Sequence, residues 1–262
     1  MNTTILLISE FIGALAVIMI LSLSPVIRNK RPLIFLYPKR EGTAALTVGV
    51  LVLLITAFAQ RFQPQIFESL INFYTYPGLF NSPQKEFSSI GSLTAQILFS
   101  AAIILPIIIG LAFRKQPLLS VGLGKAGMKA GLQMGAALVI LAIFLQGKIF
   151  AIINGLTQGA FITLTIALAA AIGEEVVFRG YIQPRFSSWL GEKWGWLAAA
   201  LFYTAWWAIP AAGSFTGDGI TFLVSLLYRI SLGLLLGWLM KKTGSLYAPI
   251  LYHTAHLWLG FM

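Results

Sequence analysis

The sequence predicts an all-α fold, a polytopic bundle of helices integral to a membrane. Hydrophobic residues make up 58% of the 262 residues, and charged residues only 10%. A soluble domain carries about 25% charged residues. Apolar runs recur along the chain, each about long enough to cross ~30 Å of hydrocarbon. The chain has no cysteine, which excludes disulfides, a thiolate nucleophile and cysteine-ligated metals.

Apolar runs of this kind predict about eight transmembrane helices. They cover residues 3–26, 43–60, 91–113, 130–153, 157–178, 194–212, 220–240 and 245–262. We divide the chain into an N-terminal part, 1–114, with three spans and an outer interfacial loop, and a core, 115–262. Because little chain remains outside the spans, we expect one structural domain.

Basic residues outnumber acidic ones by 18 to 8, and their positions predict the topology. They lie between apolar spans, so we interpret them as membrane orientation signals and expect no nucleic-acid partner. Four loops hold 14 of the 18 basic residues: 28–40, 114–129, 179–193 and 241–245. The positive-inside rule places these loops in the cytoplasm and both termini outside a cell membrane.

Two adjacent carboxylates end the fifth predicted span, in "GEEVVFRG" at residues 173–180. Glu175 and Arg179 are four residues apart with the acid first, which favours an ion pair on one helix face. Glu174 points about 100° away from its neighbour and has no local partner. It must therefore face a polar cavity or another helix, unless both glutamates simply anchor the span near the headgroups.

Both histidines and one arginine lie inside the last two predicted spans. His253 and His256 share a helix face, and His253 lies about 12 Å from the predicted cytoplasmic end. With a carboxylate they could activate water, hold a metal, or form an interhelical hydrogen bond. Arg229 sits in mid-span, so it needs a buried anion such as Glu10, or it binds an anionic substrate group.

These residues resemble the CAAX protease and bacteriocin-processing (CPBP or Abi) family, which includes type II CAAX prenyl endopeptidases. "EEVVFR" matches the motif EExxxR, and "GLLLGWLMKKTGSLYAPILYH" matches the approach to the last motif. The resemblance covers roughly 115–262. Two positions depart from the family: Trp206 replaces the histidine of FxxxH in "FYTAW", and Leu257 replaces the asparagine of HxxxN in "HTAHL".

The resemblance implies a metal-free mechanism without a cofactor, in which a glutamate and the second-motif histidine activate water. The last-motif histidine and asparagine stabilise the oxyanion. Carried over, Glu174 is the base and His253 an oxyanion donor. Trp206 cannot accept a proton, although its indole N–H can donate one hydrogen bond, and Leu257 offers no donor. We hypothesise that His256 compensates by turning toward Glu174.

The sequence therefore predicts an intramembrane glutamate endopeptidase whose cavity faces the cytoplasm. Its substrate would be a membrane-associated peptide or protein, prenylated or not. The alternative is a proteolytically inactive relative that binds or assembles another membrane protein. An acyl-transfer enzyme is less favoured because no serine or cysteine nucleophile stands beside the histidines. A transporter is also less favoured, because no matched pair of broken helices is visible.

Overall fold

The computed structural model describes residues 3–28, 35–62, 90–214 and 219–259. The described part is all-helical. Its helices are α1 (Thr3–Leu21), α2 (Pro25–Arg28), α3 (Pro38–Phe62), α5 (Ile90–Phe113), the 3-10 helix η2 (Leu118–Val121), α6 (Lys125–Leu145), α7 (Ile149–Ile153), α8 (Gln158–Glu175), the π-helix η3 (Val176–Ile182), α9 (Gln183–Leu190), α10 (Glu192–Ser214), α11 (Gly219–Thr243) and α12 (Tyr247–Leu259). The predicted helical bundle is confirmed.

Five helical segments of the described chain are long and apolar enough to cross a membrane. They lie in α3, α5, α6, the continuous α8–η3–α9 segment and α11. Large apolar side chains such as Phe58, Ile108 and Phe144 point out of the bundle, as expected for a lipid-facing surface. The polytopic architecture is thus supported, whereas the predicted count of eight spans is not. The outer loop expected within 61–90 lies almost entirely outside the described residues.

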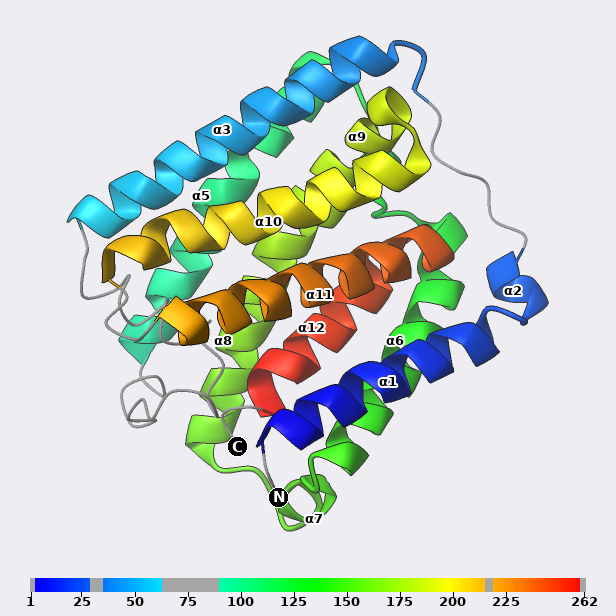
Figure 1. The fold of residues 1–262 in the computed structure, drawn as a ribbon, viewed down its shortest axis with the longest axis vertical. Helices are drawn as coiled ribbons and strands as arrows, with labels where there is room; N and C mark the ends of the chain where they lie inside the picture. Colours follow the sequence, from blue (N-terminus) through cyan, green and yellow to red (C-terminus); the bar gives the residue numbers. More distant parts are fainter. Residues whose placement is uncertain (1–2, 29–34, 63–89, 215–218, 260–262) are drawn as a thin grey trace.

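The last predicted span is a short central helix. Helix α12 has 13 residues, about 20 Å of helix, which is less than the ~30 Å of a bilayer core. Figure 1 shows it enclosed by its neighbours, and it packs against α6, α8 and α11. Residues 252–259 are all buried. The position of α12 explains its polar side chains, because they face protein on every side.

The loop predicted at 179–193 is wrong, because the chain stays helical from Gln158 to Leu190. Its two arginines, which we read as loop markers, are buried and paired. Arg179 lies 3.4 Å from Glu175, and Arg185 lies 3.0 Å from Glu41 of α3. A cation inside a bundle is tolerated when a carboxylate neutralises it. Through the ion pair between Glu41 and Arg185, helix α3 of the N-terminal part holds the C-terminal end of the α8–η3–α9 segment.

Local signals account for several helix ends. Thr157 caps α8, since its hydroxyl accepts a hydrogen bond from the Ala160 amide at 3.2 Å. Gly244, with φ of 60°, turns the chain between α11 and α12, a conformation that favours glycine. The Thr243 hydroxyl closes this turn by donating to the Ser245 carbonyl at 3.0 Å. The turn delivers both histidines of α12 into the centre of the bundle.

Candidate active site

The acidic pair lies where the α-helix α8 changes into the π-helix η3. Residues 173–182 are buried without exception. A π-helical turn inserts extra backbone into a helix and is found frequently at functional sites. It also allows close packing here: a side chain at Gly180 would stand 2.8 Å from the Val121 carbonyl. The local backbone thus holds the motif against η2 and the start of α12.

His253 lies between the two carboxylates. Its Nδ1 is 2.8 Å from Glu175 Oε1, a hydrogen-bond distance, and its Nε2 is 4.0 Å from Glu174 Oε2. An ionised carboxylate only accepts, so the Nδ1 facing Glu175 carries a proton, and in the neutral form of the ring Nε2 presents its lone pair toward Glu174. Glu174 and Glu175 are consecutive and point in different directions, and they therefore face the two different ring nitrogens of His253.

Several buried polar atoms at this point have no hydrogen-bond partner in the described structure. They include both oxygens of Glu174 and Nε2 of His253. Buried polar groups are nearly always hydrogen-bonded, so each exception needs an explanation. At 4.0 Å, Glu174 Oε2 and His253 Nε2 are too far apart for a direct hydrogen bond. A third polar group between them would satisfy both atoms.

Arg179 forms the expected pair with Glu175, through Nη1 at 3.4 Å from Oε1. Its Nη2 also donates to the Gly233 carbonyl of α11 at 3.5 Å, and its guanidinium lies 4.2 Å from the centre of the Tyr203 ring. Glu175 thus contacts both Arg179 and His253. From the sequence we predicted only the Glu175–Arg179 pair. The contact between Glu175 and His253 was not predicted, because these residues are 78 positions apart.

The two departures from the family motifs are packed into the core. Trp206 is buried beside Phe178, with ring centroids 5.3 Å apart, and its Nε1 donates to Thr56 Oγ1 at 2.8 Å. The indole N–H, the one donor that we predicted for Trp206, therefore points to Thr56 of α3. Leu257 is buried in the same apolar cluster. Neither side chain supplies a base or an oxyanion donor, in agreement with their chemistry.

The structure does not bring His256 to Glu174. Its Nδ1 is 2.7 Å from Glu10 Oε1 of α1, and its Nε2 contacts the Tyr228 hydroxyl. Glu10 also accepts hydrogen bonds from Tyr252 at 3.0 Å and from Gln146 at 2.9 Å. His256 therefore belongs to a second buried network, which joins α1, α6, α11 and α12.

Arg229 is buried on α11 and faces aromatic side chains. Its Nη1 donates to the Tyr203 hydroxyl at 3.3 Å, and its guanidinium lies 4.8 Å from the Trp207 ring centre. Glu10, the partner that we had named for Arg229, is instead surrounded by the second network. Tyr203 was missed by the sequence reasoning, which considered only the first and last positions of "FYTAW". Its spacing of three residues from Trp206 was the available signal.

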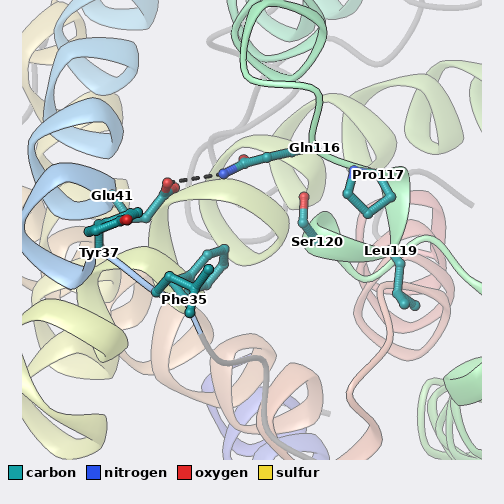
Figure 2. Close-up of a pocket in the computed structure, with 8 residues that line it drawn as sticks. Phe35, Tyr37, Glu41, Gln116, Pro117, Leu119 and Ser120 are labelled. Atoms are coloured by element: carbon teal, nitrogen blue, oxygen red, sulfur yellow. Dashed lines mark hydrogen bonds between the residues drawn. The ribbon is translucent and has the colours of Figure 1, made fainter.

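Two further features lie outside this cluster. In the described part of the chain, no three histidine, aspartate or glutamate side chains are arranged to hold a metal ion. A cavity of about 350 Å³ opens between the start of α3 and the α5–η2 connection. Figure 2 shows Glu41 and Gln116 in its wall, joined by a 3.0 Å hydrogen bond. Neither Glu174 nor His253 lines this cavity.

Comparison with known proteins finds a match within the core of the chain. Residues 156–259 match the type II CAAX prenyl endopeptidase Rce1-like family. The resemblance carried by "EEVVFR" and His253 is thus confirmed over this segment, which covers less than half of the chain. The Rce1-like segment contains the acidic pair, both histidines, Tyr203 and Arg229. No curated protein and no solved structure matches the chain.

Proposed function

We propose that the protein is an intramembrane endopeptidase that uses Glu174 to activate water. One observation carries the proposal: a buried, unpaired carboxylate faces an unpaired imidazole nitrogen across 4.0 Å. An intramembrane carboxylate is costly, so it is retained where it functions or is paired. Because Glu174 has no hydrogen-bond partner among the described residues, a functional role accounts for it better than a structural one.

The reaction follows from this geometry. Glu174 takes one proton of a water molecule, and the neutral His253 Nε2 accepts the hydrogen bond of the other. The water oxygen bonds to the scissile carbonyl carbon and converts the carbonyl oxygen into an oxyanion. When the carbon–nitrogen bond breaks, Glu174 gives its proton to the leaving amine. Atoms and charge balance without a metal or a cofactor.

Glu175 and Arg179 position His253 in this scheme. The Glu175 carboxylate holds the Nδ1–H at 2.8 Å, and Arg179 in turn pairs with Glu175. Such a chain fixes both the tautomer and the orientation of an imidazole. The family resemblance implied that His253 donates a hydrogen bond to the oxyanion. With the proton held on Nδ1, its Nε2 instead accepts a hydrogen bond from the attacking water before the reaction. The oxyanion then needs another donor.

The substrate that we propose is a membrane-associated, CAAX-type peptide or protein, which the Rce1-like match supports. The buried position of Glu174 within an apolar helix supports a site inside the bilayer. We place the site in the cell membrane with access from the cytoplasm, on the basic residues of the loops predicted at 28–40, 114–129 and 241–245. Arg229, the candidate from the sequence for a substrate carboxylate, donates instead to the Tyr203 hydroxyl at 3.3 Å.

The test compares wild type with Glu174→Gln on fluorogenic membrane-tethered peptides, prenylated and plain, with and without a chelator. We expect turnover in the wild type, a loss of about 10²–10⁴-fold in the variant, and no effect of the chelator. Glu192→Gln is a matched control, since Glu192 is exposed and pairs with Lys241. Equal turnover in wild type and Glu174→Gln would contradict the proposal.

The second candidate is a proteolytically inactive partner of another membrane protein. The burial of Trp206 and Leu257 in the apolar cluster favours it, because neither side chain supplies a base or an oxyanion donor there. If no peptide is cleaved in a Glu174-dependent manner, this candidate takes precedence. Copurification of one defined membrane protein, retained by Glu174→Gln, would then support it.

A further inference from the structure

Tyr203 forms part of the candidate site on the side of α10. It is fully buried, and its ring packs against Phe178 at 5.2 Å and stacks on Trp206 at 6.2 Å between centroids. The Arg179 guanidinium lies over the same ring. These contacts hold the phenol in a single orientation beside η3, the segment that follows Glu174 and Glu175.

The hydroxyl of Tyr203 is left as a hydrogen-bond donor. Its oxygen accepts a hydrogen bond from Arg229 Nη1 at 3.3 Å. A phenol has one O–H donor in addition to its acceptor lone pairs, so this contact uses an acceptor position. No hydrogen bond from the O–H to another described residue is formed. A buried donor without an acceptor is rare and calls for a ligand or a function.

The Tyr203 ring is connected to the water-activating pair through Arg179. The Arg179 guanidinium lies 4.2 Å from the ring centre and pairs with Glu175 at 3.4 Å, and Glu175 in turn holds His253 at 2.8 Å. A hydrogen bond from the Tyr203 hydroxyl to a developing negative charge is strong in this buried space, because water is excluded from it.

We propose that Tyr203 is the oxyanion donor of this site and that Arg229 is the residue that positions it. This inference rests on the proposed peptidase function. The Tyr203 O–H donates a hydrogen bond to the carbonyl oxygen as that oxygen becomes negative, and no bond to Tyr203 forms or breaks. Tyrosine hydroxyls serve in this way in oxyanion holes. The role fills the gap left by Leu257 and by the acceptor tautomer of His253.

The test measures kcat, KM and the thermal midpoint of Tyr203→Phe on the best peptide of the tethered panel. Phenylalanine keeps the ring contacts and removes only the hydroxyl. We expect kcat to fall about 10²–10³-fold, as for loss of one oxyanion donor, with KM and the thermal midpoint unchanged. Tyr181→Phe is the matched control, because Tyr181 is equally buried on η3 but stacks under Arg185.

Arg229→Gln separates a positioning role from a direct one. We expect a smaller fall in kcat than for Tyr203→Phe, and no additional fall when both substitutions are combined, since Arg229 acts through Tyr203. Additive losses would assign Arg229 an independent contact with substrate and overturn its positioning role.

The remaining outcomes separate this inference from the proposed function. Wild-type kcat in Tyr203→Phe, with turnover abolished in Glu174→Gln, would overturn the role of Tyr203 and leave the peptidase intact. A fall in kcat that only follows a lower thermal midpoint would make Tyr203 structural and also overturn it. Absence of any Glu174-dependent turnover would remove the peptidase and this inference together.

Discussion

Helix α12 carries two histidines one turn apart, and their surroundings differ. His256 Nδ1 contacts Glu10 at 2.7 Å, its Nε2 contacts Tyr228, and both oxygens of Glu10 accept hydrogen bonds. His253 Nδ1 contacts Glu175 at 2.8 Å, but its Nε2 faces Glu174, whose oxygens have no hydrogen-bond partner among the described residues. The first network is closed, whereas the second is open on one side.

The difference separates stability from chemistry. A fully satisfied buried network stabilises one arrangement of helices, because removal of any member leaves a buried polar group without a partner. An open network costs stability and is retained where its unpaired atoms react with something else. The two networks also adjoin different apolar clusters: Tyr252, beside Glu10, belongs to one, and Phe178, beside Arg179, belongs to the other.

The largest expected effect is on turnover at the open network. Glu174→Gln removes the base, so kcat should fall about 10²–10⁴-fold. The thermal midpoint should stay equal or rise, because the amide replaces an unpaired buried charge. Turnover and thermal unfolding in the same detergent measure both quantities. A midpoint lowered by many degrees would show that Glu174 has a structural partner and that its network is closed like that of His256.

The next effect is on stability at the closed network. Glu10→Ala leaves His256, Tyr252 and Gln146 without their acceptor, and loss of one partner of a buried pair costs about 3–5 kcal/mol. The fraction that remains folded should keep the kcat of the wild type. Thermal unfolding and active-site-normalised turnover check the two expectations.

The exposed pair of Glu192 and Lys241 provides the control for that experiment. Glu192 is 68% exposed in a 3.0 Å ion pair, so Glu192→Ala should cost less than about 1 kcal/mol. If Glu10→Ala is as mild as Glu192→Ala, the second network does not hold α1 to the core. A loss of kcat in folded Glu10→Ala would instead connect His256 to the chemistry.

The fold was predictable where local composition decides it. Apolar runs gave helices close to their observed limits, as in 91–113 against Ile90–Phe113 of α5. Apolar runs predicted a loop at 179–193, where the chain is helical to Leu190. The error arises because hydropathy counts Arg185 as polar even though a carboxylate neutralises it inside the bundle. The partner is Glu41, 144 positions away, and no sequence spacing indicates it. The short length of α12 was missed because an apolar run does not reveal whether lipid or protein surrounds it.

The site was predictable as a set of residues but not as a set of contacts. The spacing of four residues gave the Glu175–Arg179 pair, and the motif placed Glu174 near His253. The partner of His256 was not predictable, since Glu10 lies 246 positions away. Tyr203 was overlooked because its importance comes from Arg229 on another helix. Interhelical partners depend on packing, which one sequence does not display.

A substitution at Glu175 should affect both turnover and stability, because its carboxylate contacts His253 and Arg179. Glu175→Gln weakens the hold on His253 and leaves Arg179 without its counter-charge. Loss of a group that orients a reacting side chain typically lowers activity about 10–100-fold. We expect that fall in kcat together with a lower thermal midpoint, whereas Glu174→Gln lowers kcat alone. Wild-type values for both would show that Glu175 does not position His253.

The smallest effect is expected at Trp206, where the family motif has a histidine. Trp206→Phe keeps an aromatic ring beside Phe178 and Tyr203 and removes the indole together with its hydrogen bond to Thr56. The Thr56 hydroxyl still donates to the Val52 carbonyl at 2.8 Å, so no buried donor is stranded and the cost should be near 1 kcal/mol. The value of kcat should fall far less than in Tyr203→Phe, because a phenylalanine ring still packs beside Tyr203. Trp207→Phe is the control, since the Trp207 N–H has no hydrogen-bond partner among the described residues. A large loss of kcat in Trp206→Phe alone would place the indole in the reaction, and the open network would then extend to α10 through Trp206 as well as Tyr203.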